Sequence, residues 1–184
     1  MTYSTKAFVF IVLLLFLSAC ATHNAQFAAN NKTTKPFTNE KEIEHSFYLI
    51  GDAGNAPIGT TTTALKAFKA ALKKAPENST AIFLGDNIYP NGFPKKEHKD
   101  IAFAKHQMRV QIAAVSDFKG ETLFLPGNHD WYSGLKGLKR QEKYIENAIG
   151  KNTFLPEDGC PIAKIHVSDE IELILIDSEW YITN

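Results

Sequence analysis

The chain has 184 residues, with 20 Lys and Arg against 20 Asp and Glu, 44% hydrophobic residues and 22% charged residues. This length suits one domain with a buried core, and the composition argues against a disordered chain. A formal net charge of zero excludes a strong basic field, so no nucleic-acid partner is expected, and two cysteines exclude a disulfide framework or a four-cysteine zinc site.

The amino terminus has the pattern of a bacterial lipoprotein signal. Lys6 precedes an apolar run at residues 7–17, which is shorter than the roughly 20 residues of a spanning helix. Residues 17–20, which end at Cys20, resemble a lipobox, in which the cysteine takes a diacylglyceryl group. The alternative is an ordinary cleaved signal with Cys20 near the cut. We expect residues 1–20 to be a lipoprotein signal and the protein to be anchored in a bacterial cell envelope, facing the periplasm or the cell exterior.

Residues 21–44 predict a flexible tether between this anchor and a folded domain. They hold Asn, Thr, Lys and Glu with few large apolar residues, and they lack helical and strand periodicity. We therefore expect the domain to cover residues 45–184.

Strands and helices alternate from residue 45 onward. Short apolar runs predict buried strands, and apolar residues at helical spacing predict the helices between them. This order is typical of βαβ units, so we predict an α/β fold with a mainly parallel central sheet flanked by helices. The predicted strands are residues 47–50, 81–84, 122–125, 162–167 and 172–177, and the predicted helices are residues 64–75, 97–117 and 138–149.

Oxygen-bearing side chains follow the first three predicted strands. Asp52 and Asp86 each follow a glycine directly, and Gly127 precedes Asn128 and His129. Because parallel strands end at one edge of a sheet, we expect these side chains to converge. Asp and Asn oxygens beside a His suit a dinuclear metal centre that activates water for attack on phosphorus. One Gly-Asp pair is usually only a turn, but three consecutive strand ends favour a site.

The three motifs resemble those of calcineurin-type metallophosphoesterases. They are residues 51–54 (GDAG), 85–89 (GDNIY) and 127–130 (GNHD). The common first motif is Asp-x-His, and Gly54 stands in the place of that His. Tyr89 stands where the purple acid phosphatase branch has a compensating tyrosine. The resemblance covers residues 45–184 and implies the metallophosphoesterase fold, of α+β sandwich type, and hydrolysis of phosphate monoesters or diesters.

The same resemblance implies the metal ligands. Asp52 and Tyr89 would bind the first metal, Asp86 would bridge, and Asn128 would bind the second metal through its amide oxygen. A phenolate ligand favours Fe(III), so the implied cofactors are two metal ions, Fe(III) with Fe, Zn or Mn. The other interpretation of Tyr89 is a tyrosine packed under the loop before Pro90.

The resemblance also implies two catalytic residues. His129 would bind the phosphate or protonate the leaving group, and Asp130 could orient His129. The expected substrate is a small phosphate ester. Two alternatives stay open: a lipoprotein binding module that keeps the fold without catalysis, and a phosphoesterase directed at nucleotides or nucleic acid. The neutral charge disfavours a polymer substrate.

The ligand set carried by these motifs is incomplete. The resembled branch needs further His ligands, including a pair in a Gly-His-x-His motif, whereas this sequence has six His and no His-x-His. We therefore expect the amino-terminal part of a longer protein, with an incomplete second sheet, weak binding of at most one metal, negligible activity alone and exposed apolar sheet surface.

Weaker signals flank the motifs. Trp131 and Tyr132 are expected either to stack on an organic substrate or to pack in the core. The glycines after them, at positions 134 and 137, predict a mobile loop. His98 and His106 lie on a predicted helix and are expected at the surface.

Overall fold

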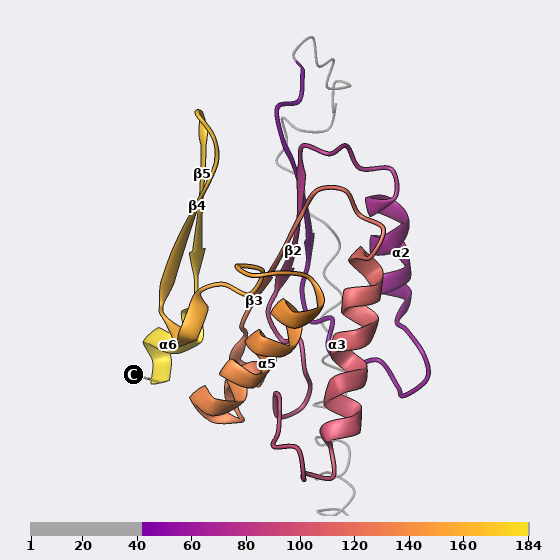
Figure 1. Ribbon diagram of the computed structural model, residues 1–184, viewed down its shortest axis with the longest axis vertical. Coiled ribbons are helices and arrows are strands. Elements are labelled where there is room, and N and C mark those ends of the chain that lie inside the picture. Colours follow the sequence, from indigo (N-terminus) through magenta and orange to yellow (C-terminus); the bar gives the residue numbers. More distant parts are fainter. Residues whose placement is uncertain (1–41, 184) are drawn as a thin grey trace, which may run out of the picture. The chain divides into compact units, whose positions relative to one another are not determined.

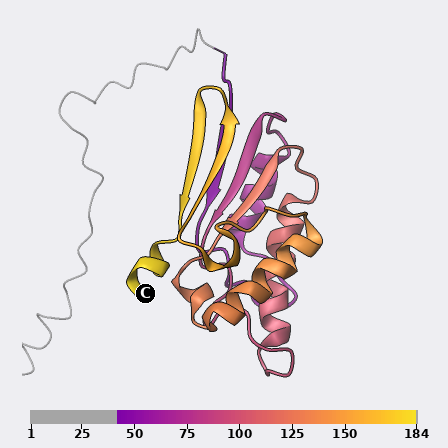
Figure 2. The same cartoon turned by 60° about the vertical axis from the view of Figure 1, so that its left-hand side comes forward.

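The computed structural model describes residues 42–183, and Figures 1 and 2 show the arrangement of their helices and strands. A parallel three-stranded sheet has the order β1-β2-β3, and β4 pairs with β5 in an antiparallel hairpin. The predicted α/β fold, with a parallel sheet flanked by helices, is confirmed. The strands are β1 (Ser46–Ile50), β2 (Ser79–Leu84), β3 (Glu121–Leu125), β4 (Ile162–Ser168) and β5 (Ile171–Ile176).

Helices connect the parallel strands and cover one face of the sheet, as Figure 1 shows for α2, α3 and α5. The side chain of Thr62 caps the first of these helices by accepting the backbone N–H of Leu65 at 3.2 Å. The helices are α2 (Thr63–Leu72), α3 (Ile101–Val115), α4 (Asn128–Trp131), α5 (Gly134–Ala148) and α6 (Ser178–Thr183), with the 3-10 turn η2 (Glu157–Gly159).

The main core lies between this sheet face and the helices. Phe83 of β2 and Phe124 of β3 are fully buried and stack, with ring centroids 4.1 Å apart and planes at 4°. Phe68 of α2 meets Phe83 edge-on at 5.5 Å. Burial of these rings stabilises the central strands and fixes the sheet edge at which the motifs lie.

The hairpin packs against the opposite face of the sheet. Leu175 of β5 is buried in a second apolar cluster with Ile82 and Leu123. Successive hairpin side chains alternate between this cluster and solvent, so Ile174 and Ile176 are exposed. The hairpin is consistent with a partial second sheet of the predicted fold.

Three sequence expectations need correction. Residues 97–100 form turns, and the helix begins at Ile101. The expected mobile loop is the start of α5, whose first residue, Gly134, has a φ of 66°. His106 is buried and does not lie at the surface; its Nε2 is 2.9 Å from the Pro57 carbonyl oxygen, so the buried ring has a hydrogen-bond partner.

The predicted lipoprotein signal, including Cys20, lies outside the described residues, as does most of the predicted tether. Within residues 42–183, no helix combines the length and the apolar composition that crossing a bilayer requires.

Candidate metal and catalytic site

Backbone hydrogen bonds join the first two motifs at the carboxyl edge of the sheet. The N–H of Asp52 donates to the Gly85 carbonyl at 3.3 Å, and that of Gly54 donates to the Asp86 carbonyl at 3.1 Å. The N–H of Tyr89 donates back to the Gly54 carbonyl at 2.9 Å. Asp52 and Asp86 both have a φ of 53°, a left-handed conformation that non-glycine residues adopt mainly where the surrounding structure imposes it. The two carboxylates are therefore held beside each other.

Close packing explains the glycine at position 54. A Cβ added to Gly54 would lie 2.2 Å from the backbone carbonyl carbon of Asn87. No side chain fits there without a shift of the backbone. The His that the common first motif would place at this position is therefore excluded by the fold of this loop.

Three oxygen atoms converge at Tyr89. Its hydroxyl lies 2.6 Å from Asp52 Oδ1 and 2.8 Å from Asp86 Oδ2. Around an octahedral cation with metal–oxygen distances of ~2.1 Å, neighbouring oxygens are about 3.0 Å apart. The Tyr89 hydroxyl therefore lies near enough to both carboxylates for a small hard cation to take the place of the phenol proton. Partial burial raises the pKa of the Tyr89 phenol, and the hydrogen bonds to the two carboxylates raise it further.

Asn128 faces the same cavity as the two carboxylates. Its Nδ2 donates to the Tyr132 hydroxyl at 2.7 Å, which leaves its carbonyl oxygen as the ligand atom. The cavity measures about 440 Å³, and Asp52, Asp86, Asn128, Tyr132 and Glu179 contribute to its lining. The structure thus brings three predicted ligands together with Tyr132, which was expected to stack on a substrate or pack in the core, and adds Glu179, which no sequence motif indicated.

The carboxylates alone do not form a metal site. Within residues 42–183, no group of three or more His, Cys, Asp and Glu side chains is placed to hold a metal ion. Asp86 Oδ1 already accepts the backbone N–H of His129 at 3.1 Å. A centre here therefore depends on the phenol of Tyr89, on the amide of Asn128 and on further ligands.

His129 lies beside this cavity between two aromatic rings. Its ring centroid is 4.2 Å from that of Tyr89 and 4.8 Å from that of Tyr132. Its Nδ1 lies 2.7 Å from the Pro90 carbonyl oxygen. Since a carbonyl oxygen only accepts, Nδ1 carries a proton, and Nε2 is the nitrogen left for a substrate.

The Asp130 carboxylate has no hydrogen bond to the His129 ring that it was expected to orient among residues 42–183; the Pro90 carbonyl accepts from that ring instead. The Asp130 carboxylate is fully buried and accepts five hydrogen bonds of 2.9–3.1 Å, so it ties the second motif to the third. Burial raises the pKa of this carboxyl to about 6, although the hydrogen bonds oppose the shift. The donors are the backbone N–H groups of Asn87, Ile88 and Gly127 and the side-chain amides of Asn87 and Gln141.

The two aromatic residues after this motif have different environments. Trp131 packs against the main core, and its Nε1 donates to Asp177 Oδ2 at 2.8 Å. Tyr132 is 56% exposed and stands at the candidate site. Trp131 therefore packs against the core, as one of the two expectations had it, whereas Tyr132 is exposed and can contact a ligand.

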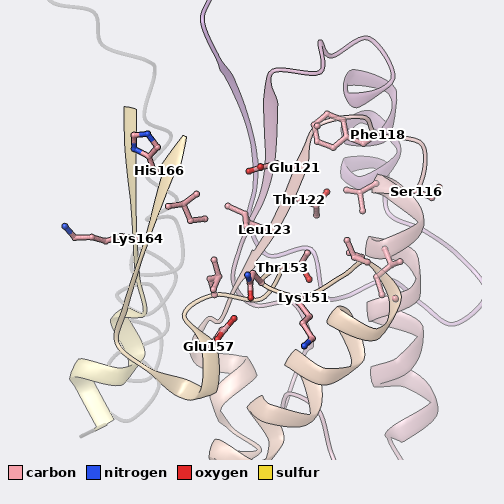
Figure 3. A pocket seen from close by; sticks show the side chains of 18 residues that line it. Ser116, Phe118, Glu121, Thr122, Leu123, Lys151, Thr153, Glu157, Lys164 and His166 are labelled. Carbon is pink, nitrogen blue, oxygen red and sulfur yellow. The ribbon is translucent and has the colours of Figure 1, made fainter. Parts of the chain in front are cut away.

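A larger cavity of about 1100 Å³ lies at the opposite end of β3, beside the hairpin (Figure 3). Glu121 and Thr122 of β3 line it, together with Lys151 and Glu157. Lys164 also borders it, but its side chain extends away from the sheet. None of the predicted site residues lines this cavity.

One of three comparisons with known proteins gave a match. A sequence profile of the calcineurin-like phosphoesterase family matches residues 45–176, a range that holds all three motifs and every strand from β1 to β5. Neither the search of curated proteins nor the search of solved structures found a match.

Proposed function

This chain belongs to the calcineurin-like phosphoesterase family, and from that membership we propose that the cavity at Asp52, Asp86 and Asn128 hydrolyses small phosphate monoesters or diesters. The observation that carries the proposal is the approach of the Tyr89 hydroxyl to both carboxylates, at 2.6 and 2.8 Å. A tyrosine in this position, combined with a glycine at position 54 that admits no side chain, supports a purple acid phosphatase-like branch.

Two metal ions, Fe(III) with Fe, Zn or Mn, are the cofactors of this proposal. Asp52 and Tyr89 would hold the first, Asp86 would contact both, and Asn128 would hold the second. Metal ions bound there would neutralise phosphate charge and lower the pKa of the attacking water. Because the sequence has no His-x-His, this chain alone is expected to bind at most one metal weakly and to show negligible turnover.

The residues of the chain supply orientation and a proton. The Pro90 carbonyl fixes the His129 ring through Nδ1, so Nε2 can bind the phosphate or protonate the oxygen of the leaving group. Asp130 holds the loops of the second and third motifs together and does not itself reach the substrate. Its role is therefore to position the ligands.

Metal binding by two variants tests these roles. We expect Asp86→Asn to lower Mn²⁺ affinity by about tenfold or more, because Asp86 is assigned to both metals. His129→Asn should bind Mn²⁺ nearly as the parent does. Equilibrium dialysis against Mn²⁺ measures both. Equal losses would make His129 a ligand, and absence of metal binding in every form would favour a non-catalytic binding module.

We also propose that the protein is a lipoprotein anchored through Cys20 in a bacterial envelope, on the basis of residues 17–20. One acyl chain gives only marginal membrane binding, whereas a multiply acylated cysteine holds a protein durably. Cys20→Ser should therefore move the protein from the membrane fraction to the soluble fraction. An unprocessed Cys20→Ser protein that fractionates just as the parent does would contradict the anchor.

A further inference from the structure

A second cavity, of about 450 Å³, adjoins the candidate site. Tyr132 lines both cavities, and Tyr89 lines the second one while its hydroxyl meets the site carboxylates. Pro90, whose carbonyl oxygen binds His129 Nδ1, also lines the second cavity. A group that leaves phosphorus beside His129 therefore has this cavity next to it.

Basic residues outnumber acidic ones among the residues that line this cavity. Lys95, His98 and Arg140 line it together with one acidic residue, Asp100. Nδ1 of His98 accepts the Asp100 backbone N–H at 3.2 Å, so this nitrogen carries no proton and adds no positive charge to the cavity. In the part of the chain that the structure describes, no carboxylate pairs with Lys95. Its ammonium group is therefore available to a ligand.

Arg140 adds a second positive charge on a braced side chain. Its Nε donates to the Pro94 carbonyl at 3.1 Å, and its Nη2 donates to the Phe93 carbonyl at 2.8 Å. A guanidinium has five N–H groups, so donors remain after these two bonds. Among residues 42–183, no carboxylate pairs with Arg140 either. The positive charge of Lys95 and Arg140 is a feature of this cavity and not of the whole sequence, whose formal net charge is zero.

Apolar and aromatic surface completes the cavity. Phe103 of α3 is partly buried in the wall, and the exposed ring of Tyr132 faces the same space. An aromatic or apolar body of a ligand could pack on these rings while an anionic substituent pairs with the basic groups.

From this lining we propose that the second cavity binds the leaving group of the phosphate ester and prefers a leaving group that carries an anionic substituent, a carboxylate or a second phosphate. The inference rests on the proposed function and narrows its substrate class. It also assigns Lys95 as the principal specificity residue.

Binding of leaving-group products to the metal-free chain tests the inference. Phenol and 4-hydroxybenzoate have the same ring and differ by one carboxylate. We expect 4-hydroxybenzoate to bind about fivefold more tightly than phenol, the size of effect that an exposed ion pair gives. NMR titration of the full chain measures both dissociation constants, and the amide shifts should map to Gly92, Phe103 and Tyr132. Because no metal or turnover is needed, the outcome is independent of the proposed hydrolysis.

Lysine variants make the test specific. Lys95→Ala should abolish the preference for 4-hydroxybenzoate, and Lys95→Arg should retain it. Lys96→Ala is the matched control, because Lys96 is equally an exposed lysine but does not line the cavity. Equal affinity of the parent for both compounds would overturn the inference. An equal loss in Lys95→Ala and Lys96→Ala, or shifts that map elsewhere, would overturn it too.

Discussion

Tyr132 determines which atom of Asn128 is free for a ligand. The amide nitrogen of Asn128 donates to the Tyr132 hydroxyl at 2.7 Å, so the amide oxygen is the one left to bind a cation. Hydrogen-bond partners of this kind hold metal ligands in their binding orientation.

We assign the single, weakly bound Mn²⁺ ion to the cavity that Asp86 and Asn128 line together. We therefore expect Tyr132→Phe to weaken Mn²⁺ binding by about tenfold, since the amide loses the partner that orients it. Titration of Mn²⁺ followed by EPR measures the affinity. Tyr144→Phe is the control, because Tyr144 packs near Phe93, with ring centroids 5.4 Å apart, and has no hydroxyl hydrogen bond among residues 42–183. Unchanged affinity in Tyr132→Phe would show that Tyr132 does not orient the amide.

The sequence predicts some site residues and misses others for a physical reason. Asp52, Asp86 and Asn128 can be placed together because each follows a strand of one parallel sheet. The environment of Asp130 could not be predicted, because its donors come from chain segments that only the folded structure brings together. Tyr132 was recognised as a ring near the motif, but its bond to Asn128 depends on a side-chain rotamer that no spacing encodes.

At the scale of elements, Asp177 connects the end of the hairpin to two helices. Its Oδ2 accepts Trp131 Nε1 of α4 at 2.8 Å, and its Oδ1 accepts the backbone N–H of Trp180 in α6 at 3.2 Å. Burial raises the pKa of the Asp177 carboxyl, and the hydrogen bond from Trp131 opposes the shift. We therefore expect the contribution of Asp177 to the free energy of unfolding to depend on pH.

The direction of that dependence follows from the raised pKa. The folded state holds the Asp177 proton more tightly than the unfolded state, so the contribution to the free energy of unfolding is full below pH ~4 and is lost as pH rises through the folded-state pKa. Asp177→Asn keeps an oxygen acceptor and cannot ionise. The stability of this variant relative to the parent should therefore be higher at pH 7 than at pH 4.

Urea unfolding at the two pH values, followed by tryptophan fluorescence, measures the difference. Asp169→Asn controls for the loss of one negative charge, since Asp169 is exposed in the turn between β4 and β5. If the stability of Asp177→Asn relative to the parent were the same at both pH values, ionisation of Asp177 would not affect the stability of the fold.

The boundaries of α3 and α4 could not be predicted from the spacing of apolar residues in the sequence. The charged residues 97–100 continue a helical pattern, but the N–H of His98 donates to the Lys95 carbonyl, and that of Ile101 donates to the His98 carbonyl. These turns delay the helix to Ile101. Helix α4 has four residues, which is too few to show a period, so the sequence could not predict it.

At the scale of the whole domain, the two faces of the sheet are covered unequally. The helices bury one face of the sheet, whereas the hairpin covers only part of the other face. Apolar side chains on that second face are therefore exposed, as the sequence predicted. Leu49 of β1 is 57% exposed and Leu84 of β2 is 50% exposed. Ile174, on the outer side of the hairpin, is 52% exposed. Among residues 42–183, β1 is also an edge strand, and no described strand pairs with its outer backbone groups.

This surface should make the domain associate with itself, because apolar patches and open strand edges favour contact between copies. We expect the double variant Leu49→Lys and Ile174→Lys to weaken self-association of residues 21–184 by about tenfold, since two apolar side chains become charged. Sedimentation velocity over a concentration series measures it, with circular dichroism to verify folding. Ile58→Lys is the matched control, since Ile58 is 65% exposed but lies in the loop between β1 and α2. Self-association that is the same in the parent and in the folded double variant would show that these sheet surfaces do not attract one another.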